Sequence, residues 1–381
     1  MLDQFGEEPL MIAMGDTVAF PGGALVVDGG LAAAAVFQAL YARTTIPFIP
    51  LLIRVFATRR GDLLQPLAGR LGDPTSSRGL FLSVECYERA PYLTAEAQGA
   101  DAARASGLAP HGSLIRPYLD DCDAWHRFRA SPTELGAVTS TIPTLILTGT
   151  FDPITPPTWG RLAAATLSNS LYVEVRTAGH GVPMDACTRG IMHDFLDDPD
   201  APPDTACNEA RAPITFITDV HLNGGIYRVA TALRVGPGLA TVAWPGLTVL
   251  ILLSGLLLWP LPWLTRRRRM HQPVATGWVL AARWVAGLAA LAAITFLALL
   301  VWTVLRTART APLILAFGVP GSAGLLFLIP WLVLVFGVLT LALAAAAWRQ
   351  GWWSMPWRIH YLLVGLACLS YVGFLSHWRL F

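Results

Sequence analysis

The last third of the sequence consists mainly of long apolar segments, and a chain with such segments cannot fold as a single soluble domain. A helix needs about 20 apolar residues to cross a bilayer, and a buried helix of a soluble domain would not repeat this length four times. Pro320-Gly321 indicates where the third segment, which is too long for one straight helix, begins its span. The sequence therefore predicts an all-α transmembrane domain of four helices over 239–381, with apolar segments at 239–264, 278–305, 312–348 and 359–377.

The loops between these segments differ in their arginine content, which predicts their orientation. One side carries seven arginines, namely Arg266 to Arg269, Arg283, Arg349 and Arg358, and the other carries three, namely Arg306, Arg309 and Arg379. Short cytoplasmic loops are enriched in Lys and Arg. We therefore expect a multi-pass protein of the cell membrane in which residues 1–238 and the C-terminus are extracytoplasmic.

Composition excludes several classes of function. Only 14% of the residues are charged and the net charge is +2, which gives no basic surface for a nucleic-acid partner. The sequence has no zinc-type Cys/His pattern, P-loop or dinucleotide fingerprint, so we expect no cofactor or metal. The apolar segments contain no acidic residue to carry protons or ions. The bilayer is the expected partner, and the sequence leaves the oligomeric state open.

Four of the five cysteines lie in the polar part of the chain. These are Cys86, Cys122, Cys187 and Cys207, whereas Cys368 lies in an apolar segment. Four cysteines in one extracytoplasmic region can form two disulfides, which would indicate an oxidising compartment. The alternative is four buried free thiols. The predicted orientation favours disulfides.

The polar part contains a pattern typical of an α/β fold. Residues 143–149 and 171–176 predict strands, and 159–167 (with Thr158 as N-cap) and 189–196 predict helices, which together form a βαβα unit with a parallel sheet. Before this unit, 16–28 predicts a hairpin with a Pro-Gly-Gly turn, and 30–70 and 93–107 have helical spacing.

Asp152 and His180 each follow one of the two predicted strands. The carboxyl ends of parallel strands meet at one edge of a sheet, where functional groups collect. A carboxylate at this edge can hold an imidazole in the tautomer that acts as a base. The glycines beside His180 allow a sharp turn that leaves the ring exposed.

These segments resemble the C-terminal part of tripeptidyl-aminopeptidase-like α/β-hydrolases, which are secreted serine exopeptidases. The family motif PTLLLTG-x-x-DP-x-TP is matched by Pro143–Pro156, and the motif GxGHG by Ala178–Gly181, with Thr177 in place of the first glycine. A cysteine, the sequence FLDDP and a second cysteine are matched at Cys187, Phe195–Pro199 and Cys207. The resemblance covers about residues 1–230.

The resemblance implies roles for particular residues. Asp152 would be the catalytic acid and His180 the catalytic base, Cys187 would pair with Cys207, and Cys86 with Cys122 in a helical lid. The expected fold is α/β, a partial α/β-hydrolase with a helical lid, followed by the membrane helices. The expected domains are 1–140 (lid and hydrolase remnant), 141–210 (Asp/His segment), 211–238 (juxtamembrane linker) and 239–381.

The family's serine nucleophile, on a G-x-S-x-G turn upstream of the acid, has no counterpart in this sequence. Ser83 and Ser113 are not on a strand-to-helix turn, and Met1–Gly15 lacks the basic and apolar regions of a signal peptide. One hypothesis accounts for both gaps, that the chain is the C-terminal part of a longer protein; the alternative is a degenerate protein. The function predicted is a membrane-anchored serine hydrolase for peptide or ester substrates, an exopeptidase by the resemblance. Without its serine, this chain is expected to be inactive and to remain unlabelled by a fluorophosphonate probe. The alternative is a non-catalytic hydrolase-like binding module on a membrane anchor.

Overall fold

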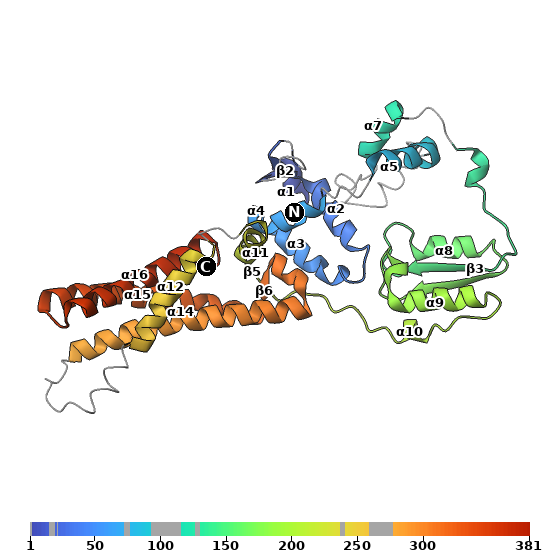
Figure 1. Ribbon diagram of the computed structural model, residues 1–381. Coiled ribbons are helices and arrows are strands. Elements are labelled where there is room, and N and C mark those ends of the chain that lie inside the picture. Colours follow the sequence, from blue (N-terminus) through green and yellow to red (C-terminus); the bar gives the residue numbers. More distant parts are fainter. Residues whose placement is uncertain are drawn as a thin grey trace. The chain divides into compact units, whose positions relative to one another are not determined.

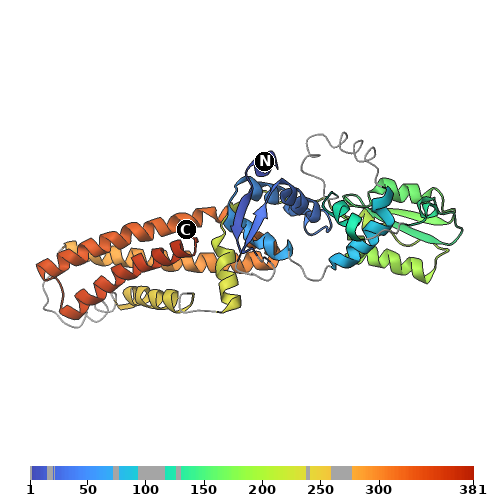
Figure 2. The ribbon, with the colours of Figure 1, turned by 90° about the horizontal axis from the view of Figure 1, so that it is seen from above.

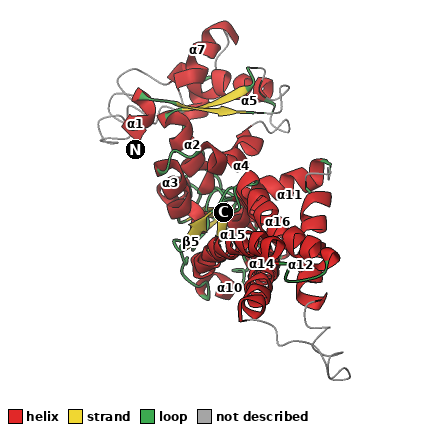
Figure 3. Ribbon diagram, turned by 90° about the vertical axis from the view of Figure 1, so that its left-hand side faces the viewer, coloured by secondary structure: helices red, strands yellow, loops and turns green. Residues whose placement is uncertain are grey.

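The computed structural model describes residues 2–14, 20, 22–71, 77–92, 116–125, 130–236, 241–258 and 277–381. The chain divides into two compact units, Met1–Thr218 and Asp219–Phe381. Helices make up most of the described residues, and strands occur only in short pairs (Figure 3). The predicted helical segment 93–107, Ser113 and the arginines at 266–269 lie outside the described residues.

The first unit begins with α1 (Leu2–Glu7) and an antiparallel pair, β1 (Leu10–Ala13) and β2 (Ala24–Val27). Strand β2 lies inside the hairpin predicted at 16–28, but residues 15–19, which include its first predicted strand, lie outside the described residues. The apolar run Leu10–Ala13 pairs with β2 and buries Ile12 on the same side as Val27. Gly23 has a φ of +65°, a left-handed conformation that suits glycine where the chain turns into β2.

Short helices follow the hairpin. Asp28 caps α2 (Gly29–Ala39) by accepting a hydrogen bond of 2.8 Å from Leu31 N–H. The next helices are η1 (Ile46–Phe48), α3 (Ile49–Ala57), α4 (Gly61–Leu71), α5 (Arg78–Val84), η2 (Glu85–Arg89), η3 (Ala90–Tyr92), α7 (Arg116–Trp125) and η4 (Pro132–Leu135). Cys86 in η2 and Cys122 in α7 lie at disulfide distance, with sulfur atoms 1.96 Å apart, as the resemblance implied.

A parallel pair of strands carries the candidate site. Strand β3 (Thr144–Gly149) pairs with β4 (Ser170–Val175), with Thr144 opposite Ser170 and Gly149 opposite Val175. Helices α8 (Pro157–Ala164) and α9 (Ala186–Asp197) cover the two faces of this sheet (Figure 1). Successive side chains along a strand point to opposite faces of the sheet, so β3 and β4 present side chains to both helices.

The α8 face is close-packed through a glycine. A Cβ on Gly160 would lie 2.4 Å from Thr148 and 2.9 Å from Tyr172, so the helix can approach the sheet only with glycine there. On the α9 face, Ile191 packs against an apolar cluster that includes Val173 and Val175. The predicted N-cap at Thr158 is wrong, because Pro157 occupies the first turn, where proline's missing N–H costs nothing.

The end of the first unit is tied back to α9. The short helix α10 (Ala206–Glu209) carries Cys207, whose sulfur lies 2.03 Å from that of Cys187. Beyond it, the segment expected as a linker, 211–238, contains β5 (Val220–Leu222) and α11 (Gly225–Val235), which belong to the second unit. Strand β5 pairs antiparallel with β6 (Gly318–Pro320), which accounts for regular structure in this segment.

Long apolar helices form most of the second unit, and Figures 1 and 2 show them side by side. They are α12 (Ala243–Leu258), α14 (Gly277–Thr310), α15 (Ile329–Gln350) and α16 (Met355–His377), with η6 (Pro312–Ala316) and η7 (Gly321–Leu328) between α14 and α15. In the described residues three helical segments are long and apolar enough to cross a membrane: Gly277–Thr310, Gly321–Gln350 and Met355–His377. The second of these begins at Gly321, where the sequence predicted the start of the third apolar span.

Small residues allow these helices to pack closely. Alanines of α14, among them Ala282 and Ala293, are buried in the core of the unit. The hydroxyl of Tyr361 donates to Ala282 O over 2.8 Å, and that of Tyr371 donates to Ala293 O over 3.0 Å. Each buried phenol thus has a hydrogen-bond partner, as an apolar environment requires. Cys368 is free and buried in the same core.

Candidate active site

The loops after β3 and β4 cross at the carboxyl edge of the sheet. Thr150 N–H donates to Val175 O over 3.1 Å, and Phe151 N–H donates to Ala178 O over 2.9 Å. A Cβ on Gly149 would lie 2.2 Å from Gly179 O, so the two loops can approach this closely only with glycine at 149. The crossing brings Asp152 and His180 together.

The two predicted site residues are in direct contact. The Nδ1 atom of His180 lies 3.1 Å from each carboxylate oxygen of Asp152. The Asp152 side chain is 3% exposed, whereas that of His180 is 37% exposed. A buried carboxylate therefore holds one nitrogen of a ring that is open to solvent.

Hydrogen bonds fix the charge state of Asp152. Its Oδ1 accepts from the backbone N–H groups of Ile154 (2.8 Å) and Thr155 (2.9 Å), and its Oδ2 accepts from the Thr155 hydroxyl (2.8 Å). Burial alone would raise the pKa of Asp152, but these hydrogen bonds and that of His180 outweigh it and hold the pKa below its usual value. Asp152 is therefore ionised at neutral pH.

An ionised carboxylate can only accept hydrogen bonds, so it selects the tautomer of His180 that has its proton on Nδ1. The lone pair of Nε2 is then available to take a proton. Within the part of the chain that the structure describes, Nε2 of His180 has no hydrogen-bond partner. The arrangement can act as a general base once a hydroxyl or water lies beside Nε2.

The segment between α2 and η1 holds the His180 loop from its other side. The Tyr41 ring meets the His180 ring edge-on, with ring centres 5.2 Å apart, and Tyr41 O accepts from Gly181 N–H over 2.7 Å. A Cβ on Gly179 would lie 1.7 Å from Leu40 O, so this contact requires glycine. Burial raises the pKa of the Tyr41 phenol, and the charge of Asp152 raises it further.

Thr177 has a φ of +59°, a conformation in which β-branched residues are strained. It stands where the resembled motif has its first glycine, and the positive φ gives the physical reason for that glycine. The Thr177 hydroxyl accepts a hydrogen bond of 2.9 Å from Nε of Arg43. Sequence reasoning missed Tyr41 and Arg43, because no local pattern shows that 40–43 contacts 177–181.

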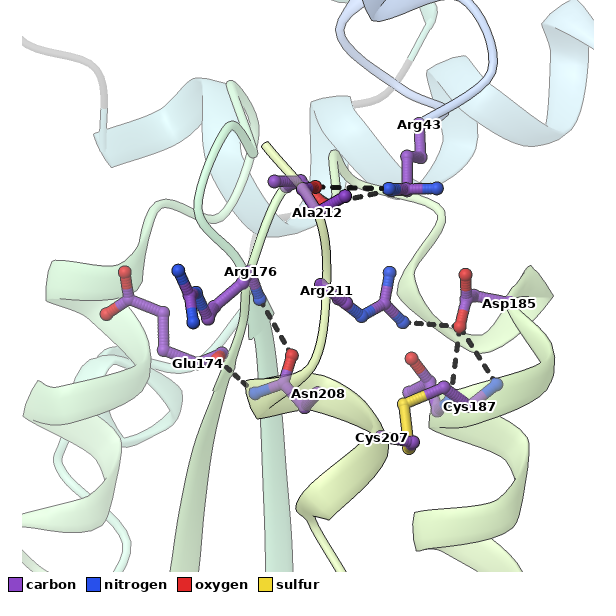
Figure 4. Close-up of polar contacts among 11 residues, drawn as sticks. Arg43, Glu174, Arg176, Asp185, Cys187, Cys207, Asn208, Arg211 and Ala212 are labelled. Atoms are coloured by element: carbon purple, nitrogen blue, oxygen red, sulfur yellow. Dashed lines mark hydrogen bonds and ion pairs between the residues drawn. A yellow bond between two sulfur atoms is a disulfide. The ribbon is translucent and has the colours of Figure 1, made fainter. Parts of the chain in front are cut away.

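Behind the loop, a polar network anchors α9 and the outer edge of β4 (Figure 4). Asp185 caps α9 by accepting from the N–H groups of Cys187 (3.0 Å) and Thr188 (3.3 Å), and it pairs with Arg211, whose side chain is 6% exposed. Burial alone would raise the pKa of Asp185, but Arg211 and the helix N–H groups lower it. The cap therefore fixes the start of α9 shortly after His180.

Asn208 covers the free edge of β4 (Figure 4). Its Oδ1 accepts from Arg176 N–H over 2.9 Å, and its Nδ2 donates to Glu174 O over 3.0 Å. One side chain thus satisfies two backbone groups that an edge strand would leave open. Asn208 follows Cys207 directly, so the disulfide to Cys187 holds it in place.

Among the described residues, no serine hydroxyl is hydrogen-bonded to His180. The Ser83 hydroxyl is inside helix α5, where it donates to Gly79 O (2.9 Å) and accepts from Trp125 Nε1 (3.2 Å). The described residues contain no group of three or more His, Cys, Asp or Glu side chains that could hold a metal ion.

Residues 112–207 match the family model for TAP-like proteins, an α/β-hydrolase family. The match covers about a quarter of the 381-residue chain and includes Asp152 and His180. It ends at Cys207, so the disulfide partner of Cys187 lies within it. No curated protein and no solved structure matches the chain. The family match therefore supports a hydrolase-like domain in the segment that carries the Asp–His pair.

Proposed function

We propose that this protein is the acid–base part of a membrane-anchored serine hydrolase, with Asp152 as the catalytic acid and His180 as the catalytic base. The observation that carries the proposal is the geometry of the pair. A buried, ionised carboxylate holds Nδ1 of His180 while Nε2 remains open. The TAP-like match over the same residues supports the hydrolase class.

In this mechanism Nε2 of His180 removes the proton of a serine hydroxyl as the serine oxygen attacks a carbonyl carbon. Asp152 stabilises the imidazolium that forms, and the proton then passes to the leaving group. Because the printed sequence has no G-x-S-x-G turn, the chain itself does not supply this serine. We propose peptides or esters as substrates, with an exopeptidase as the closest type by resemblance, and no activity for the chain alone.

A fluorophosphonate probe, which reacts with activated serines, tests the proposal. The purified chain should remain unlabelled, since Ser83 is engaged inside α5. The protein expressed together with the in-frame coding region upstream of Met1 should be labelled on a G-x-S-x-G serine. His180→Ala in that protein should reduce the labelling rate by about 10³-fold or more.

Each outcome distinguishes this function from its alternative. Labelling that survives His180→Ala would exclude the proposed base. The absence of any upstream G-x-S-x-G would also exclude the hydrolase and leave the non-catalytic binding module. Labelling of the chain alone, abolished by Ser83→Ala or Ser113→Ala, would refute the proposed inactivity and identify another nucleophile.

We also propose that the chain has four membrane spans and an extracytoplasmic first unit. Three helical segments have the required length and composition, and the other predicted span, 239–264, contains the apolar helix α12, with 259–264 outside the described residues. The arginine distribution supports an extracytoplasmic first unit, as do two disulfides, because thiols stay reduced in the cytosol.

The orientation is testable with an impermeant thiol reagent on intact cells. Cysteine at Ser168, an exposed position of the first unit, should react, and cysteine at Gln350, the last residue of α15, should react only once the cells are opened. The native Cys368 is buried and serves as the unreactive background. The reverse pattern would place the first unit in the cytoplasm.

A further inference from the structure

A cavity in the second unit lies between the C-terminal end of α14 and helix η7. Its volume is about 330 Å³. The α14 side contributes Leu299, Trp302, Thr303, Arg306 and Thr307, and the η7 side contributes Ala323 and Leu326 among others. The lining is therefore apolar at one end and polar at the other, which is the pattern of a site for an amphiphile.

The side chains of Thr303, Arg306 and Thr307 lack partners among the described residues, whereas the Thr310 hydroxyl donates to Arg306 O over 3.1 Å. Thr303 and Thr307 are 7% and 3% exposed, and the described part of the chain offers neither hydroxyl a hydrogen bond. The guanidinium of Arg306 lies over the Trp302 ring, 5.4 Å from its centre, and has no acidic partner among the described residues. Hydroxyls of such residues at the cavity wall, beside a cation without an acidic partner, are suited to an anionic ligand with several acceptor oxygens.

The position of Arg306 along α14 sets the depth of the cavity in a membrane. Residues 284–305 of this helix carry no charge, so Arg283 and Arg306 bound an apolar stretch of 22 residues. At 1.5 Å per residue this stretch is about 33 Å long, close to the roughly 30 Å of a bilayer's hydrocarbon core. Arg306 therefore lies at the level of the lipid headgroups, and Leu299 lies about 10 Å deeper, at the level of the acyl chains.

We propose that this cavity binds one anionic phospholipid. The phosphate lies against Arg306 and the Thr307 hydroxyl, and the upper part of one acyl chain lies against Leu299 and Leu326. A cavity of about 330 Å³ holds a headgroup and the start of a chain, and the remainder of the lipid stays in the bilayer. No acidic residue lines the described cavity to bind the ammonium of a zwitterionic headgroup, so the site selects for negative charge.

Native mass spectrometry of the full chain in detergent tests the proposal. With equal amounts of phosphatidylglycerol and phosphatidylcholine, the protein should retain one phosphatidylglycerol with at least a tenfold preference. Arg306→Gln should reduce this preference at least fivefold. Arg309→Gln is the matched control, because Arg309 is exposed near the end of the same helix but does not line the cavity.

Two further variants separate a built site from surface charge. Thr307→Val keeps the side-chain volume and removes the hydroxyl proposed to contact the phosphate. Ala323→Phe fills the apolar end of the cavity without changing its charge. Each variant should weaken the retention of phosphatidylglycerol while the helical circular dichroism signal stays unchanged. Equal loss in Arg306→Gln and Arg309→Gln, or unchanged retention in Ala323→Phe, would overturn the proposal. So would equal retention of the two lipids, or displacement of the lipid by free glycerol 3-phosphate at the same concentration. None of these readouts depends on hydrolase activity.

Discussion

Replacing Asp152 with asparagine should move the proton of His180 from Nδ1 to Nε2. Both backbone N–H groups that hold the carboxylate donate to Oδ1. In the Asp152→Asn variant the amide oxygen must continue to accept from these two N–H groups. An NH₂ group in the same position would place donor against donor. The NH₂ group then replaces Oδ2 and donates to Nδ1 of His180, which must become an acceptor.

The size of the change follows from the hydrogen bond that is exchanged. A hydrogen bond to a charged, buried carboxylate contributes about 1.5–3 kcal/mol. At about 1.4 kcal/mol per factor of ten, the Nδ1–H tautomer in the native protein is favoured roughly ten- to a hundredfold. The Asp152→Asn variant should reverse this preference. Asp152→Ala leaves the N–H groups of Ile154 and Thr155 without an acceptor and should cost more stability, about 1–3 kcal/mol for each group left buried.

Nitrogen NMR of the full chain in detergent, with ¹⁵N in the histidine rings, distinguishes the two tautomers. The signals of His180 are identified by their loss in His180→Asn. At pH values where the ring is neutral, the native spectrum should show Nδ1 protonated, and the Asp152→Asn spectrum should show Nε2 protonated. A native ring protonated on Nε2, or a variant still protonated on Nδ1, would refute the role assigned to Asp152.

Two other perturbations test the surroundings of the pair. Thr177→Gly should be more stable than Thr177→Ala by about 1 kcal/mol in thermal unfolding, because both lose the Arg43 hydrogen bond and only glycine relieves a φ of +59°; equal stabilities would contradict the strain. The lowered pKa of Asp185 means that its ion pair with Arg211 stabilises the fold fully above the unfolded pKa of about 3.9 and is lost as pH falls through the lower, folded pKa. Asp185→Asn should therefore lose stability at pH 7 and show a smaller further loss than the native protein as the pH falls below about 4; parallel pH profiles would show that the pair contributes nothing.

Local sequence patterns predicted the elements that carry the site. The apolar runs that end at Gly149 and near Val175 form the parallel pair, and the polar residues directly after them meet at its carboxyl edge. Such a prediction needs only neighbours in the sequence and the rule for parallel strands. The start of the third apolar span at Gly321 was predictable for the same reason, because proline and glycine interrupt a helix locally.

Contacts between distant segments could not be predicted in this way. The packing of Tyr41 and Arg43 on the His180 loop joins residues more than a hundred positions apart. Arg211 and Asn208 likewise act on α9 and β4, although sequence reasoning assigned no role to either residue. The cavity beside Arg306 depends on the approach of η7 to α14, which no single apolar segment specifies.

The contacts that hold the Asp–His pair are all independent of a nucleophile. Gly149 allows the two loops to cross, Thr155 fixes the carboxylate, and Tyr41 and Gly181 hold the far side of the His180 loop. The pair is thus a property of the scaffold and would persist in a chain that has lost its serine. Nε2 of this partly exposed ring can hydrogen-bond to water in either kind of chain, so the open lone pair alone does not separate a hydrolase from a binding module. The two functions are therefore separated by a serine beside Nε2, which the fluorophosphonate probe detects and which the contact with Asp152 does not report.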